Sequence, residues 1–276
     1  MSNILVPLDF SPNAINALKY ADNLANSINA NLIVLNIYDG GISNYEAGWP
    51  IEELFDNVVK MIQEKTNAII KENCSSTNIS TVFKNGNVKD LIIESIDLLG
   101  ANFVVMGTHG ASLITKVLFG SNTAHTIAHS KVPVLAIPGD FSYTPLQKIV
   151  YASDFNNLNA ELMLLNKVSK QLKNIPIETL HLRYETESAE NISEDFQKVI
   201  AENNYQNIQL QQEIFDLDNT LANAIREYAE AQQNIILAMF AEDRNIFQSL
   251  FLGSKTEYLT YKLNVPLLAM NKAKIN

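Results

Sequence analysis

The 276-residue sequence lacks features that would place it in several common protein classes. It has one cysteine, Cys74, so no disulfide can form within the chain, as expected in a reducing compartment. No catalytic motif surrounds Cys74, which we expect to be an inert thiol. No apolar run approaches the roughly 20 residues that span a bilayer, and the N-terminus lacks a secretory signal. These absences predict a soluble, cytoplasmic protein with no membrane partner.

An excess of basic residues is also missing. The formal net charge is −10, and each half of the chain carries −5 when it is divided after Asp140. A nucleic-acid-binding module needs a basic face that replaces the counterions along the phosphates. The sequence therefore predicts no nucleic-acid partner. The hydrophobic content of 47% is that of a folded globular protein and excludes a disordered chain.

The chain contains two copies of one pattern. A short apolar run that ends in Asp-Phe occurs at Asn3–Ser11 and again at Lys148–Asn156. A Gly-Ser pair and a Val-Pro-x-Leu-Ala run follow late in both halves, at residues 120–121 and 132–136, then at 253–254 and 265–269. The repeat predicts two domains, 1–140 and 146–276, joined near Gly139–Pro145. The second half is shorter, and we expect the extra residues of the first half in the loop near 39–50.

Apolar runs alternate with amphipathic segments in each half. In the first half, strands are expected near 3–9, 31–38, 79–84, 102–107 and 132–137, and helices near 13–28, 51–73, 87–99 and 113–129. Nearly continuous apolar strands are buried on both faces, as in parallel sheets. The prediction is an α/β protein with two doubly wound, parallel, five-stranded sheets of the Rossmann-like type.

Two strand ends in the first half carry residues suited to ligand binding. Asp9 follows the first strand, where its carboxylate can bind a ribose hydroxyl or an adenine amine, help hold a metal, or simply cap the next helix. Gly107-Thr-His-Gly110 follows the fourth strand, and Gly120-Ser121 opens a helix nine residues later. Glycines allow close backbone approach, and a helix N-terminus favours an anion. The glycine spacing is that of neither a P-loop nor a dinucleotide-binding fingerprint.

The spacing Gly107-x-x-Gly110, nine residues, then Gly120-Ser121 resembles the signature of nucleotide-binding universal stress proteins, and so does the opening Ile4–Ser11. The resemblance covers the whole chain as a tandem pair. It implies an adenine nucleotide α-hydrolase-like fold that binds ATP or another adenine nucleotide, with Mg²⁺ held through the phosphates. The positions that match its binding site are Pro7, Leu8, Asp9, Ile37, Met106, Gly107, His109, Gly110, Gly120, Ser121 and Asn122.

The resemblance also implies an assembly. The last strand of each domain commonly forms the dimer contact in that family, so the tandem chain is expected to form a pseudo-dimer within itself. A homodimer of the tandem chain remains open. No catalytic residue and no protein metal site are assigned. The helical pair His125 and His129 has chelating spacing but no third ligand in view, so we interpret it as a packing or surface pair.

The second half departs from the glycine pattern. Asp154 and Gly253-Ser254 are retained, but counting back from Gly253 places Phe240 and Asp243 at the first two glycine positions. Phe240 would fill the space for close approach, and Glu242 with Asp243 would repel a triphosphate. We therefore predict that the second domain has lost nucleotide binding, whereas the role of the adjacent Arg244 stays open.

Three functions remain at this stage. The first is a regulatory module that binds ATP in its N-terminal half. The second is a slow ATPase or phosphotransfer enzyme, although the glycine loop offers no catalytic Lys or Arg. The third is an interaction scaffold that binds no nucleotide, against which the intact glycine set of the first half argues.

Overall fold

The computed structural model describes residues 2–38, 51–76, 78–108, 120–183, 190–216, 219–241 and 263–271. The first half contains β1 (Asn3–Pro7), α1 (Pro12–Ile28), β2 (Asn31–Tyr38), α2 (Ile51–Asn73), β3 (Ile79–Asn85), α3 (Val88–Leu98), β4 (Phe103–Gly107), α4 (Ser121–His129) and β5 (Val134–Ile137). The strands and the first three helices match the sequence expectation closely. The expected last helix is observed from Ser121 onward, and its start at 113–119 lies outside the described residues.

The second half repeats this order. It contains β6 (Lys148–Ala152), α5 (Leu158–Gln171), β7 (Ile177–Arg183), α6 (Glu190–Asn203), β8 (Ile208–Ile214), α7 (Leu221–Glu230), β9 (Ile235–Phe240) and β10 (Leu267–Met270). The predicted α/β fold with alternating strands and helices is confirmed.

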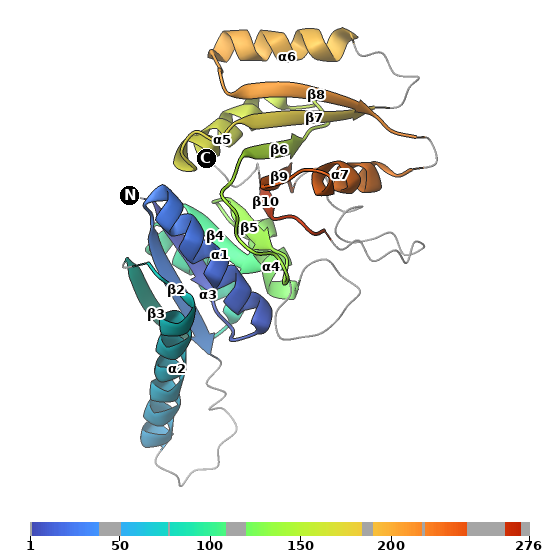
Figure 1. The fold of residues 1–276 in the computed structure, drawn as a ribbon. Helices are drawn as coiled ribbons and strands as arrows, with labels where there is room; N and C mark the ends of the chain where they lie inside the picture. The colour runs from blue at the N-terminus through green and yellow to red at the C-terminus, as the bar shows by residue number, and fades with distance from the viewer. Residues whose placement is uncertain are drawn as a thin grey trace.

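All strands belong to one ten-stranded sheet with the order β3-β2-β1-β4-β5-β10-β9-β6-β7-β8 (Figure 1). Every neighbouring pair is parallel except β5 and β10, which run antiparallel and join the two halves edge to edge. Leu135 pairs with Leu268 at the centre of this junction, flanked by the Ala136–Leu267 and Val134–Ala269 pairs. Since these positions correspond in the two copies, the junction has a local pseudo-two-fold arrangement. The two expected five-stranded sets are thus continuous, and the expected pseudo-dimer contact exists within the chain.

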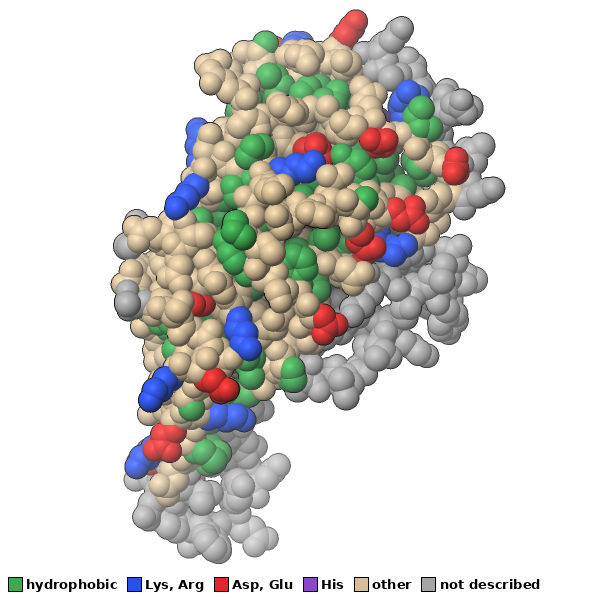
Figure 2. Space-filling model, in the orientation of Figure 1, with side chains coloured by type: hydrophobic (Ala, Val, Ile, Leu, Met, Phe, Trp, Pro, Cys, Tyr) green, Lys and Arg blue, Asp and Glu red, His purple; other side chains and the backbone are tan. Residues whose placement is uncertain are grey.

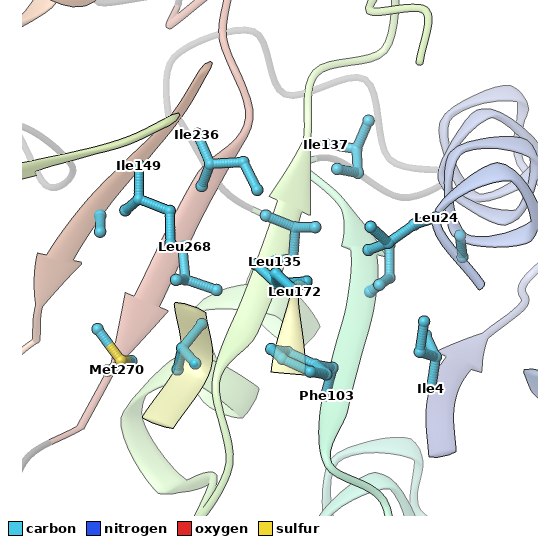
Figure 3. Close-up of a cluster of buried hydrophobic side chains, with 14 of the residues drawn as sticks. Ile4, Leu24, Phe103, Leu135, Ile137, Ile149, Leu172, Ile236, Leu268 and Met270 are labelled. Carbon is cyan, nitrogen blue, oxygen red and sulfur yellow. The ribbon is translucent and has the colours of Figure 1, made fainter. Parts of the chain in front are cut away.

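The sheet is buried on both faces. Figure 3 shows side chains of β1, β4 and β5 packing beside those of β6, β9 and β10, so the core continues across the junction. Phe103, Leu135 and Leu268 are each at most 2% exposed. Such burial removes apolar area from water at about 25 cal/mol per Å², which is the main favourable term in folding.

Local signals explain where α1 begins and ends. The Ser11 hydroxyl accepts the N–H of Ala14 at the start of α1, and Pro12 occupies the first helical position. Asn29 ends the helix in the left-handed conformation, with φ of 58°. Asn16 of α1 donates from Nδ2 to the carbonyls of Pro138 and Phe141, at 3.0 Å each. Both carbonyls belong to the segment that connects β5 to β6. The connecting segment therefore packs against α1.

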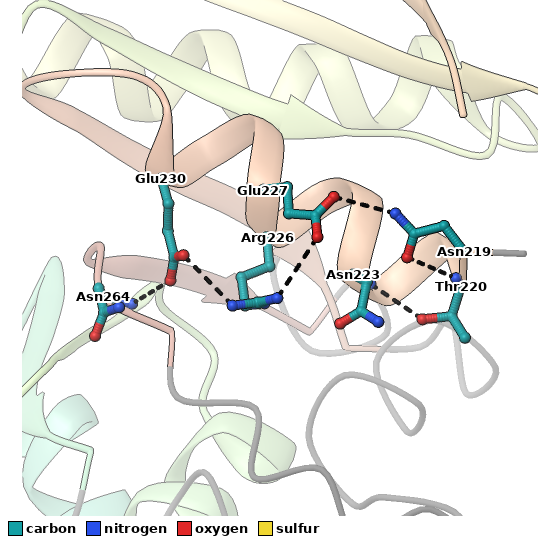
Figure 4. A network of polar contacts seen from close by, with 7 residues as sticks. All are labelled: Asn219, Thr220, Asn223, Arg226, Glu227, Glu230 and Asn264. Atoms are coloured by element: carbon teal, nitrogen blue, oxygen red, sulfur yellow. Dashed lines mark hydrogen bonds and ion pairs between the residues drawn. The ribbon is translucent and has the colours of Figure 1, made fainter. Parts of the chain in front are cut away.

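A polar network lies on α7, the helix of the second half that corresponds to α3. On α7, Arg226 lies 3.5 Å from Glu230, and Glu230 accepts the main-chain N–H of Asn264 at 3.2 Å (Figure 4). This network ties α7 to the segment that leads into β10. Basic and acidic side chains are interspersed over the face drawn in Figure 2. No helix in the described ranges has the length and apolar character needed to cross a membrane.

Candidate functional site

A cavity of about 280 Å³ lies at the carboxyl ends of β1, β2 and β4. In the order β2-β1-β4, the chain reverses its direction of travel across the sheet between β1 and β4, which is where open α/β sheets bind ligands. The volume is near the lower end of the usual range for small-molecule sites. The lining residues are Pro7, Leu8, Asp9, Ala14, Leu35, Ile37, Val88, Ile92, Met106, Gly107, Gly120, Ser121, Asn122 and Thr123.

The lining set contains most of the residues that the sequence singled out. Pro7, Leu8, Asp9, Ile37, Met106, Gly107, Gly120, Ser121 and Asn122 are all present, brought together from β1, β2, β4 and α4. His109 and Gly110 lie outside the described residues.

Asp9 combines a structural bond with an available oxygen. Its Oδ1 accepts the main-chain N–H of Ser11 at 3.0 Å, and the side chain is exposed. The residue that caps α1 is Ser11, so the capping role considered for Asp9 belongs to its neighbour. The next residue, Phe10, has φ of 62°, which turns the chain sharply between strand and helix. Within the described part of the chain, Oδ2 has no hydrogen-bond partner and remains available to a ligand at the cavity.

The N-terminus of α4 is open towards the cavity. Gly120 occupies the N-cap position, where it offers no side chain to accept a hydrogen bond. The first bond of the helix runs from the Ala124 N–H to the Gly120 carbonyl at 3.0 Å. The preceding N–H groups, from Ser121 to Thr123, therefore have no acceptor within the helix. By contrast, α1 and α3 are capped by the side chains of Ser11 and Asn87.

Short contacts hold this helix start against β4. Thr123 donates from Oγ1 to the Gly107 carbonyl at 2.9 Å, and the Gly120 N–H donates to the Thr108 carbonyl at 2.7 Å. The Thr108 N–H donates in turn to the Ile137 carbonyl at 3.0 Å. The N–H groups of Ser121 to Thr123, which have no acceptor among the described residues, are thus fixed relative to the strand ends. Together with the helix dipole, they form a preorganised anion-binding element.

Gly107 is required for the packing of α1 onto β4, in addition to its place in the cavity lining. A Cβ added at this position would lie 2.9 Å from the carbonyl oxygen of Asn13 and 3.0 Å from its carbonyl carbon and Cβ. The first turn of α1 therefore packs directly onto the end of β4. The absence of a Cβ at this position therefore serves helix–strand packing, whatever ligand approaches the main chain from the cavity.

An apolar wall of the cavity was missed by the sequence analysis. Val88 and Ile92 come from α3, and Leu35 comes from β2 beside Ile37 and Met106. The signal was present, because Val88 and Ile92 are spaced i, i+4 on the helix that follows β3. The second strand is held in place from behind, since Asn36 donates from its buried amide to the Leu8 carbonyl at 2.8 Å.

The histidine pair of α4 is a stacked pair. The rings of His125 and His129 lie 4.1 Å apart with an interplanar angle of 22°, and His129 Nδ1 is 2.9 Å from the His125 carbonyl oxygen. In the ranges that the structure describes, no group of three or more His, Cys, Asp or Glu is placed to hold a metal ion.

The equivalent position in the second half is closed by an aromatic pair. Phe240 pairs with Met270 as Gly107 pairs with Ile137, so the two residues occupy the same place in the sheet. The Phe240 ring is 2% exposed and contacts Tyr151 edge-on, with the centroids 5.6 Å apart. It packs into the core with α5 rather than into a ligand space. That helix begins one position later than α1, with its N-cap at Asn157 rather than at the equivalent of Ser11.

The aspartate that corresponds to Asp9 is also engaged differently there. Asp154 accepts the N–H of Asn156 on Oδ1 at 3.0 Å and its side-chain amide on Oδ2 at 2.7 Å. Both carboxylate oxygens are therefore occupied, whereas Asp9 has a partner for Oδ1 alone among the described residues. Glu242, Asp243, Arg244, Gly253 and Ser254 lie outside the described residues.

These features define an α/β protein of the Rossmann-like class, with a small-molecule cavity at a reversal of strand order. The profile of the universal stress protein family matches residues 1–138. The chain belongs to the universal stress protein family.

Individual relatives agree with this assignment. Universal stress protein A homolog 2 of Coxiella burnetii is 30% identical over 138 residues, which is 49% of this chain and 92% of the relative. A universal stress protein of Methanocaldococcus jannaschii is 25% identical over 139 residues, 49% of this chain and 80% of the relative. The crystal structure of a universal stress protein from Archaeoglobus fulgidus covers 98% of both chains with a TM-score of 0.64 and 18% identity. This last likeness extends the fold to the second half.

Proposed function

We propose that this chain is a regulatory module that binds ATP or a related adenine nucleotide at the cavity of its first half. The observation that carries the proposal is the uncapped N-terminus of α4, which opens into a cavity at the reversal of strand order. The domains would be 1–140, which binds, and 146–276, which does not. Bound nucleotide would act by shifting conformation or assembly, in the cytoplasm.

The lining residues divide into three regions that suit three parts of a nucleotide. Ile37, Val88 and Ile92 supply an apolar wall for the base, and the free Asp9 Oδ2 suits a ribose hydroxyl. The N–H groups at the start of α4, together with the Ser121 hydroxyl, suit the phosphates. A charged hydrogen bond from a phosphate oxygen to such a group is stronger than one between neutral groups.

A divalent cation would bind with the nucleotide. Mg²⁺ favours phosphate oxygens and water, with one or two carboxylates, over an all-protein cage. Asp9 is the acidic residue among the described lining residues, and no Lys, Arg or His is among them. Phosphoryl transfer depends on groups that stabilise charge on the transferred phosphoryl group. The described site therefore favours binding over rapid turnover.

The test is calorimetric titration of Mg·ATP into the wild type and Ser121→Asp. An aspartate in the first turn stabilises a helix through its dipole but places a negative charge where the phosphates would bind. We expect one nucleotide per wild-type chain and an affinity more than tenfold weaker in S121D. The matched control is Asn157→Asp, which adds the same charge at the N-cap of α5 and should leave affinity unchanged.

Each alternative has its own outcome. Two nucleotides per chain would show that the second half binds as well. Binding that is unaffected by S121D would place the ligand elsewhere. Absence of binding to the wild type would leave the interaction scaffold as the better account.

A further inference from the structure

The two ends of α4 contact different halves of the molecule. Its N-terminus lines the cavity of the first half. At its other end, the Ala128 carbonyl accepts a hydrogen bond from Nδ2 of Asn271 at 2.7 Å. Asn271 follows β10 directly and is 143 positions away in the sequence. A residue of the second half is therefore bonded to the helix that carries the anion-binding element.

The bonded carbonyl has no donor within its own helix. The last four carbonyls of an α-helix have no intrahelical partner. The helix closes with the Ser130 N–H donating to Thr126, and the Val132 N–H, the position that would serve Ala128, donates to the Ser130 hydroxyl instead. Asn271 supplies the missing donor from the opposite half.

The helix is short enough to move as one piece. It has nine residues, so at 1.5 Å per residue its ends are about 13 Å apart. At its start, Thr123 and Gly120 are bonded to the end of β4. At its end, Asn271 adds a contact that the first half cannot provide. Since these bonds anchor the start of the helix, loss of the bond at Ala128 would let the rest of the helix pivot about that anchor and so change the direction of its N–H groups.

The residue of the first half that corresponds to Asn271 cannot donate the same bond. Asn271 is the counterpart of Pro138 in the first copy, since Met270 and Ile137 occupy equivalent sheet positions. A proline has no side-chain donor and no main-chain N–H. Pro138 thus cannot make the bond that Asn271 makes.

We propose that Asn271 is a positioning residue for the nucleotide site, through which the second half sets the affinity of the first half for the phosphate groups. This inference rests on the proposed function. The second half, which has Phe240 in place of the glycine, would then act on the nucleotide site of the first half.

The test compares Mg·ATP and adenosine by calorimetry in wild type and Asn271→Ala. Because the effect passes through the phosphate-binding end of α4, we expect Mg·ATP affinity to fall about three- to tenfold and adenosine affinity to change less than twofold. Asn271→Gln keeps the amide donor and should recover part of the loss. Asn264→Ala is the matched control, since this exposed residue flanks the other end of β10 and bonds Glu230 through its main chain.

The outcomes separate this inference from the proposed function. No Mg·ATP binding by wild type would remove the proposed function and this inference with it. Normal wild-type binding with an unchanged N271A would overturn the inference alone. An equal loss of ATP and adenosine affinity would also overturn it, because it would indicate general disruption. If N271A fails to fold, the near-isosteric Asn271→Asp, which cannot donate, takes its place in the same comparison.

Discussion

At the scale of single residues, Gly107 and Phe240 show how one sheet position is used in two ways. The two residues occupy equivalent positions in the sheet, yet Gly107 makes room for the carbonyl of Asn13, whereas Phe240 packs on Tyr151.

Cys74 fits the expectation of an inert thiol, because burial and, to a smaller extent, Asp22 raise its pKa to about 12.

Gly107→Ala should destabilise the protein through a steric clash alone, because the backbone conformation at this position suits an alanine. The added Cβ would meet main-chain atoms of Asn13 at 2.9–3.0 Å, so α1 must move. Overpacking of this kind costs about 1–3 kcal/mol. Urea unfolding of the variant measures the loss. The comparison is Gly100→Ala, where space is open but φ is +56°, which isolates the cost of the left-handed backbone. A G107A variant as stable as wild type would contradict the packing role.

Residues at the cavity were predictable to different extents. Asp9, Gly120 and Ser121 sit at strand and helix ends, where a linear pattern indicates exposure to a ligand. Val88 and Ile92 were missed because an apolar helix residue gives no sign of which cavity it will face. The packing role of Gly107 was missed because its neighbour, Asn13, comes from a different element.

At the scale of elements, the strands and helices were predictable because continuous apolar runs and amphipathic periodicity reflect burial directly. The contacts at the ends of these strands and helices were less predictable from the sequence. The α4 helix is the clearest case, since its open N-terminus, its stacked histidines and its bond to Asn271 all depend on tertiary neighbours.

The α4 histidines predict a dependence of stability on pH. Burial lowers the pKa of His125, and the neighbouring His129 and Lys89 lower it further, although Asp90 of α3 acts in the opposite direction. The folded chain then binds this proton less readily than the unfolded chain, whose histidine titrates near about 6.5. The free energy of unfolding should therefore rise as the pH increases towards about 6.5 and level off above it.

The measurement is the midpoint of urea unfolding between about pH 5.5 and pH 7.5 in wild type and His125→Asn. The variant should show a shallower rise with pH. An identical slope in both proteins would assign the dependence to other groups.

At the scale of the whole molecule, the antiparallel junction of β5 and β10 turns two repeats into one sheet. All four residues of each strand are buried, and Leu135 and Leu268 meet at the centre. An isolated first half would expose β5 as an apolar edge, and such edges pair with other chains.

A fragment of residues 1–140 should therefore form a homodimer through β5. Light scattering coupled to size-exclusion chromatography should give twice the fragment mass. Leu135→Lys in the same fragment should shift it to a monomer, because a charge would be buried at the junction. A wild-type fragment that stays monomeric at micromolar concentration would contradict this prediction.

The covalent link between the two halves also changes what a single mutation can do. In an assembly of identical chains, every substitution appears on both sides of the axis, so a residue suited to one subunit must be tolerated in the other. Here the two sides are encoded separately, and tethering keeps their effective concentration high without reliance on dilution-sensitive association. Leu267 can face Ala136 while Ala269 faces Val134, and Asn271 can stand where the other copy has Pro138. One copy is thereby free to specialise as the support of the other.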